Sequence, residues 1–144
     1  MADSNARLSE YLLRQDKFDL AAGRDCARWV AGALEAFYGY NPISLFLGNY
    51  TTLKGQWRHW QWLLARYNVR TLPAFLEKQG WTRRAKPVEG AVCVRSQDVT
   101  PFCAGIVGWR CGELQPHFLK EDGVCVTVSD GVDFWVPPPR PVEE

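Results

Sequence analysis

The stretch FDLAAGRDCARWVAGALEAFYG, residues 18–39, decides the fold, because it combines a turn, a lone cysteine and an amphipathic helix. Asp25 favours the N-cap position, so we expect a helix to begin at Cys26 and to end near Gly39. The apolar residues recur with the spacing of a helix that buries one face: Cys26, Trp29, Val30, Ala33, Leu34 and Phe37. The first helical turn has unpaired backbone N–H groups that favour a thiolate. Cys26 is therefore placed as a nucleophile would be, although an inert buried cysteine also fits there.

The composition fits one folded domain, expected over residues 1–137, followed by a Pro/Glu-rich tail over residues 138–144. The net charge of +1 predicts no electrostatic attraction to nucleic acid or to a membrane surface. No apolar run approaches the roughly 18 residues that span a bilayer. The N-terminal stretch lacks the basic and apolar regions of a signal peptide. We therefore expect a protein that is made in the cytoplasm and does not insert into a membrane.

The five cysteines are an odd number without paired short spacing, which favours reduced thiols over a disulfide framework. Four of them lie in the second half of the chain: Cys93, Cys103, Cys111 and Cys125. They form no C-x-x-C pair, so the signal for zinc is weak. Convergence on an iron–sulfur cluster is the less favoured alternative to buried apolar thiols. We expect no cofactor and no metal.

Three further helices are expected at residues 9–15, 52–67 and 72–79. The second of these is rich in tryptophan, and its apolar residues are Trp57, Trp60, Trp62, Leu63, Leu64 and Tyr67. Core packing is the favoured interpretation of this helix. The alternative is a partner-binding surface formed by Trp57, Trp60 and Arg58, because Trp, Tyr and Arg are the usual anchors of interfaces. His59 and Arg66 lie among the same aromatic residues.

From Pro87 onward the pattern changes to short strands, expected at residues 88–94, 102–109, 113–119, 124–128 and 134–136. Glycines and Asp-Gly pairs separate them, as hairpins require. The basic residues 81–86 before the first strand are expected to form a solvated linker. Helices followed by an antiparallel sheet define an α+β fold.

The Gly-x-Asp-Cys motif before an amphipathic helix resembles the NlpC-type cysteine peptidases, papain-like enzymes that cut peptidoglycan stem peptides. A closer resemblance is to small phage proteins encoded among tail genes, which look like degenerate relatives of NlpC. It extends over residues 10–137 and implies N-terminal helices packed on a C-terminal antiparallel sheet. The shared motifs occur in the same order: Phe18, Gly23-Arg24-Asp25-Cys26, Gly39-Tyr40-Asn41-Pro42, Gly48-Asn49-Tyr50-Thr51-Thr52 with Gly55, Pro87-Val88-Glu89-Gly90-Ala91-Val92, Ala104-Gly105-Ile106-Val107, Gly123 and Trp135.

The resemblance also implies where catalytic groups would lie. In NlpC-type enzymes the base is a histidine that opens the strand ending in Gly-Ile, and Cys103 stands at that position here. A thiol substitutes poorly for imidazole, whose pKa near 6.5 suits proton transfer at neutral pH. His117 lies where these enzymes often place the third, orienting residue. Ala27 and Arg28 follow Cys26, where the enzymes usually have Ser-Gly.

These departures make Cys26 a relic of the fold or a weakly active thiol. The resemblance therefore implies a papain-like domain that acts as a structural or binding component of a phage tail, at the distal tail or tail tip. Other tail proteins are the expected partners, and the virion is the expected location. The alternative function is an active cysteine peptidase or amidase that cleaves peptidoglycan stem peptides during phage entry, with Cys26 and His117 as its catalytic residues.

Overall fold

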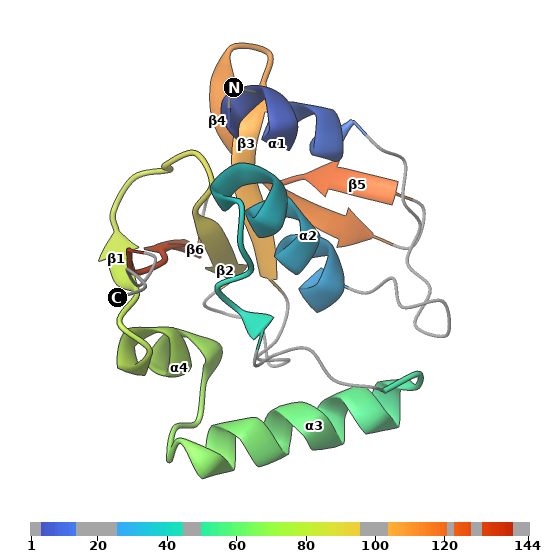
Figure 1. Ribbon diagram of the computed structural model, residues 1–144, viewed down its shortest axis with the longest axis vertical. Coiled ribbons are helices and arrows are strands. Elements are labelled where there is room, and N and C mark those ends of the chain that lie inside the picture. Colours follow the sequence, from blue (N-terminus) through green and yellow to red (C-terminus); the bar gives the residue numbers. More distant parts are fainter. Residues whose placement is uncertain are drawn as a thin grey trace.

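The computed structural model describes residues 4–13, 26–44, 50–95, 104–120, 123–127 and 131–139, and in these ranges the chain has the expected α+β architecture (Figure 1). The helices are α1 (Ser4–Leu12), α2 (Cys26–Tyr38), α3 (Leu53–Arg66) and α4 (Leu72–Lys78). The strands are β1 (Thr82–Arg84), β2 (Val92–Arg95), β3 (Ala104–Arg110), β4 (Glu113–Lys120), β5 (Gly123–Val126) and β6 (Val132–Val136). None of the described helices is long and apolar enough to cross a membrane.

The strands form one antiparallel sheet in the order β1-β6-β2-β3-β4-β5. At its centre, Val92 of β2 lies between Ile106 of β3 and Trp135 of β6. A two-residue turn at Cys111 and Gly112 joins β3 to β4, and both residues have positive φ, at 52° and 79°. Two consecutive left-handed residues match the right-handed twist of a hairpin, so this turn fixes the β3–β4 register.

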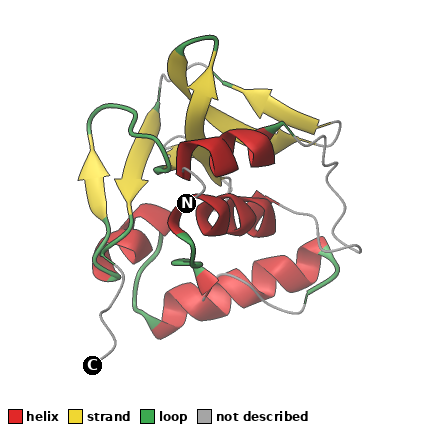
Figure 2. Ribbon diagram, turned by 45° about the horizontal axis from the view of Figure 1, so that its top comes forward, coloured by secondary structure: helices red, strands yellow, loops and turns green. Residues whose placement is uncertain are grey.

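The two faces of the sheet carry different sets of buried side chains, as the alternation along each strand requires. One face packs with the helices in the main core and contributes Val92, Val94, Ala104, Ile106, Leu119 and Trp135. The other face forms a second, smaller cluster of Ala91, Cys93, Val107, Phe118 and Phe134. Figure 2 shows the strands gathered at one side of the molecule and the helices at the other.

Helix α2 is the central element, because it contacts β3 and β4 on one side and α1 on another. The Tyr11 hydroxyl on α1 donates a hydrogen bond of 2.8 Å to the carbonyl of Trp29 on α2. Gly32 gives Tyr11 the space for this close approach, since a Cβ there would collide with the phenol ring. The expected burial of Trp29, Val30 and Ala33 is confirmed, whereas Phe37 is only half-buried at the end of the helix.

Two expectations about local structure are wrong. Helix α1 begins at Ser4 rather than at residue 9, because Leu8 is buried and the Arg7 guanidinium donates a hydrogen bond of 2.7 Å to the carbonyl of Ala36. Residues 81–86 are not a solvated linker. Trp81 is buried, and strand β1 that follows pairs with β6 at the edge of the sheet, where exposed charged side chains protect it from further pairing.

The proline-rich end docks on its own domain over the part that the structure describes. Pro137 is buried, and the Tyr40 hydroxyl donates a hydrogen bond of 3.1 Å to the carbonyl of Pro138. These prolines are therefore in contact with the protein's own domain. Residues 140–144 lie outside the described part of the chain.

Candidate functional site

Helix α3 begins where the sequence predicts, because the Thr52 hydroxyl accepts a hydrogen bond of 3.1 Å from the N–H of Gly55. Its inner face is an i, i+4, i+7, i+8 stripe of buried residues, namely Gln56, Trp60, Leu63 and Leu64. Trp60 is only 4% exposed, and its ring lies 6.3 Å from that of Tyr50. The expectation that Trp60 forms a partner surface is therefore wrong, since its side chain is part of the core.

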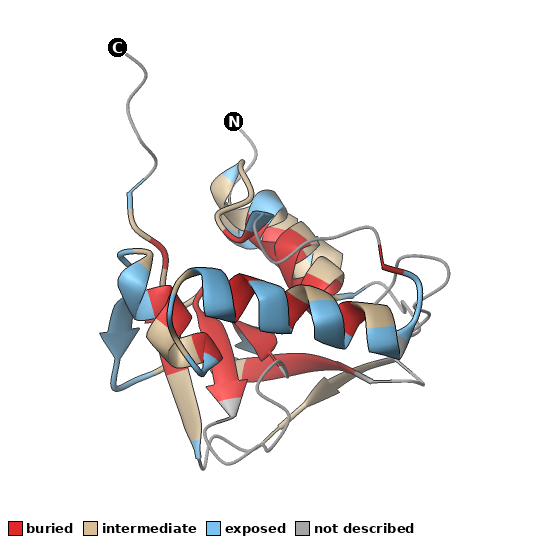
Figure 3. Ribbon diagram, turned by 90° about the horizontal axis from the view of Figure 1, so that it is seen from below, coloured by how far each residue is buried: buried red, intermediate tan, exposed pale blue. Residues whose placement is uncertain are grey.

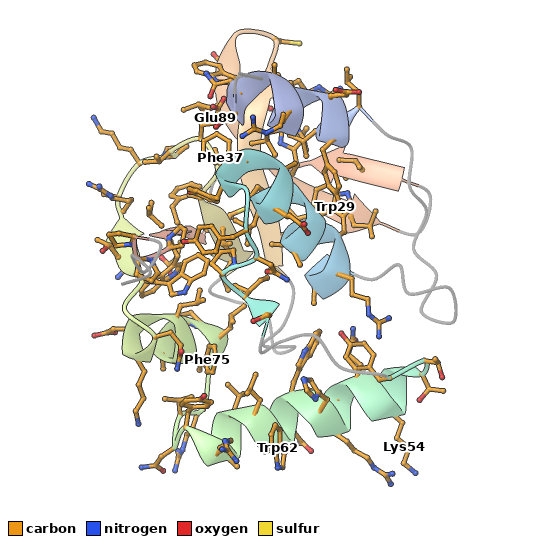
Figure 4. The ribbon with its side chains drawn as sticks, in the orientation of Figure 1. Trp29, Phe37, Lys54, Trp62, Phe75 and Glu89 are labelled. Carbon is orange, nitrogen blue, oxygen red and sulfur yellow. The ribbon has the colours of Figure 1, made fainter. Side chains whose placement is uncertain are left out.

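The outer face of α3 is exposed along the whole helix, as Figure 3 shows. Trp57 is 43% exposed and Arg58 is exposed, as a partner surface requires. Trp62 is 57% exposed, the more open of the two tryptophans, so the favoured interpretation of this helix as core packing is wrong for this residue. Figure 4 shows Trp62 and Lys54 pointing away from the rest of the molecule.

The signal for Trp62 was present in the sequence. Two residues correspond to about 200° of helical rotation, so Trp60 and Trp62 point to nearly opposite sides of α3. A helix packed on one side can bury only one of them. Leu63 and Leu64 share the arc of Trp60, which assigns Trp62 to the surface.

Two neighbours on α3 hold the exposed Trp62 ring. The Arg66 guanidinium carbon lies 5.6 Å from the ring centroid, and the His59 ring centroid lies 6.1 Å away. A cation over an exposed aromatic ring contributes about 0.5–1 kcal/mol. These contacts restrict the rotamers of Trp62 in the free protein, and they therefore lower the loss of side-chain conformational entropy when a partner binds.

The second candidate site is the junction between α2 and the sheet. Cys26 is the first residue of α2, as expected, but its side chain and residue 103 lie outside the described structure. Ala27 and Ala104, the residues that follow these two cysteines, line one small apolar cavity together with Val92. The start of α2 therefore lies near the start of β3.

His117 is buried on β4 and pairs in register with Ile106, two residues further along β3 than Ala104. Its Nδ1 lies 2.9 Å from the carbonyl oxygen of Gln115. A carbonyl can only accept, so Nδ1 is assigned as the protonated nitrogen and Nε2 as the acceptor of the neutral ring. Burial lowers the pKa of His117 below its ordinary value of 6.5, which keeps the ring neutral at pH 7.

The other cysteines are dispersed. Cys93 is buried on β2, Cys125 is half-buried on β5, and Cys111 is exposed at the β3–β4 turn. Within the described ranges, no group of three or more His, Cys, Asp or Glu residues could hold a metal ion.

The chain matches the family described as a domain of unknown function (DUF6950) over residues 1–135, and it therefore belongs to that family. No curated protein and no solved structure matches the chain.

Proposed function

We propose that this protein is a binding component of a bacteriophage tail, docking at the distal tail or tail tip through the outer face of α3. One observation carries the binding part of this proposal: Trp57 and Trp62 are both exposed on a helix whose inner face is already packed in the core. Tryptophan and arginine dominate the energy of protein interfaces. The phage context rests on the resemblance alone.

The junction between α2 and the sheet gives little support for catalysis. His117 is fixed by the carbonyl of Gln115, and the expected histidine position at the start of β3 is a cysteine in the sequence. A cysteine nucleophile needs a base in hydrogen-bond reach and a group that orients the base. We therefore propose that Cys26 is a remnant of a peptidase site.

The second candidate function is a cysteine peptidase or amidase that acts on peptidoglycan. One observation favours it: the start of α2 meets the start of β3 at the cavity shared by Ala27 and Ala104. In that case Cys26 would be the nucleophile, and the Nε2 lone pair of neutral His117 would supply or orient the base.

Incorporation into particles tests the binding proposal. A Trp57→Ala/Trp62→Ala variant should reduce the copies found by mass spectrometry in purified particles of the encoding phage by about tenfold or more, since each lost interface anchor costs over 1 kcal/mol. Trp109→Ala is the matched control, because Trp109 is 48% exposed but lies on β3. Absence of the wild type from particles, or normal incorporation of the double variant, would contradict docking through α3.

Digestion of purified sacculi separates the two functions. We expect no release of stem-peptide fragments by the wild type, slow reaction of Cys26 with iodoacetamide near pH 7, and normal assembly of a Cys26→Ala variant. Release by the wild type but not by Cys26→Ala would establish the peptidase instead. His117→Ala would then test the base.

A further inference from the structure

The net charge of +1 conceals a strong separation of charge along the chain. Residues 36–88 hold eight of the 17 basic residues but only one of the 16 acidic ones, a net charge of +7 that leaves −6 for the remainder. The one acidic residue is Glu77, and no Asp or Glu occurs between Glu35 and Glu77. The whole-chain net charge of +1 averages over this separation and does not show it.

The exposed face of α3 lies inside this basic segment and consists of two i, i+4 rows. One row is Lys54, Arg58, Trp62 and Arg66, and the other is Trp57, Gln61 and Ala65. The first row thus places an aromatic ring between two guanidinium groups. In the part of the chain that the structure describes, no carboxylate forms an ion pair with the cations of this row, whereas Arg83 on β1 pairs with Asp133 at 2.7 Å.

We infer that the partner on this face is an acidic protein segment with two carboxylates that flank an apolar group. This inference rests on the proposed binding function and specifies the chemistry of the partner. Arg58 and Arg66 are eight residues apart, which is about 12 Å along a helix, so a partner helix would match them with carboxylates at i and i+8. Apolar side chains between these carboxylates would cover Trp62, which stays anchored by Arg66.

The face is less suited to other anionic surfaces. Strong electrostatic binding of nucleic acid uses about 6–10 phosphate contacts, and this row supplies three cations beside a neutral second row. A helix that lies in a membrane interface inserts its apolar face, but the apolar stripe of α3, with Trp60 and Leu63, is packed in the core.

A pair of synthetic helical peptides tests the inference without any phage material. The acidic peptide carries glutamates at i and i+8 with leucine and phenylalanine between them, and its control carries lysines in place of the glutamates. Fluorescence anisotropy of the labelled peptides, and of a labelled 20-nucleotide single-stranded DNA, would be measured against the wild-type chain at several salt concentrations. We expect binding of the acidic peptide, no binding of the lysine peptide, and weaker binding of the DNA.

Charge reversal then locates the site. Arg58→Glu/Arg66→Glu should weaken binding of the acidic peptide by about tenfold or more, because two attractive pairs become repulsive. Arg84→Glu/Lys86→Glu makes the same change in net charge away from α3 and should have an effect below about threefold. Trp62→Ala should weaken binding without changing its salt dependence.

The other outcomes overturn the inference. An equal loss of affinity in both charge-reversal variants, or no binding of the acidic peptide, would exclude an acidic partner on this face. Tighter binding of the DNA with a steep salt dependence would make the face a nucleic-acid surface. The proposed function fails separately, because it depends on particle incorporation: charge-reversal variants that still enter particles, while Trp57→Ala/Trp62→Ala does not, would keep the docking surface and exclude its electrostatic specificity.

Discussion

Helices α2 and α3 are almost equal in length, at 13 and 14 residues, yet they have different surroundings. Helix α2 contacts both α1 and the sheet, and its side chains Val30, Ala33 and Leu34 are fully buried. Helix α3 packs with one face and leaves Trp57 and Trp62 at the surface. A helix that has more apolar residues than its buried face can hold leaves apolar surface exposed. A contiguous exposed apolar patch is characteristic of a binding site.

The largest expected difference between the two helices is the loss of stability when a side chain of each is truncated to alanine. Leu34→Ala should lower the free energy of unfolding by about 3 kcal/mol, because it removes a fully buried side chain from the core. Trp62→Ala should change it by less than about 1 kcal/mol despite the larger side chain. Urea denaturation measures both. Similar costs for the two substitutions would mean that the outer face of α3 is structural.

A second prediction concerns the contact between the end of α2 and the loop before β2. Gly90 has φ of +79°, and a Cβ there would lie 2.5 Å from the Phe37 ring. Gly90→Ala should therefore cost about 2–3 kcal/mol, from backbone strain and overpacking together. Gly112→Ala is the matched control, since φ is also +79° but nothing lies within 4 Å of its Cβ. Gly112→Ala should lower the free energy of unfolding by about 1 kcal/mol. Equal melting temperatures for the two variants would show that the clash with Phe37 does not contribute.

The pH dependence of stability should report on His117 beneath α1 and α2. Burial lowers its pKa in the folded state, so the unfolded chain takes up a proton first as the pH falls below about 6.5. The stabilisation is complete above that pH and decreases as the pH falls through the folded-state pKa. His117→Gln should reduce the decrease in the urea midpoint between pH 7.5 and pH 5. Between pH 7.5 and pH 9 the urea midpoints of both proteins should change in the same way. If the midpoint of the variant fell as much as that of the wild type at low pH, other titratable groups would be responsible.

Most of the helical framework follows from local signals in the sequence. Thr52 and Thr71 cap α3 and α4, as their hydroxyls accept hydrogen bonds from Gly55 and Ala74. These caps act over three residues, so the sequence is enough to locate them. The expected start of α2 at Cys26 and its end before Gly39 are also confirmed.

The expectations for β1 and for the start of α1 were wrong because contacts with segments far away in the sequence determine these elements. Strand β1 exists because its backbone pairs with β6, some fifty residues later, and its exposed basic side chains carry no strand pattern. The early start of α1 depends on the contact of Arg7 with the end of α2. For the candidate site, Trp57 and Arg58 were predicted from the sequence. The helical arc that Trp60 shares with Leu63 and Leu64 would also have placed Trp60 in the core and Trp62 at the surface.

Hydroxyl-radical footprinting of particle-bound and free protein measures the solvent exposure of individual tryptophans, and it therefore tests docking through the outer face of α3. We expect Trp57 and Trp62 to become protected in the particle by about tenfold or more, while Trp109 on the sheet is oxidised at the same rate in both states. Unchanged oxidation of Trp62 in a particle that contains the protein would contradict docking through the outer face of α3.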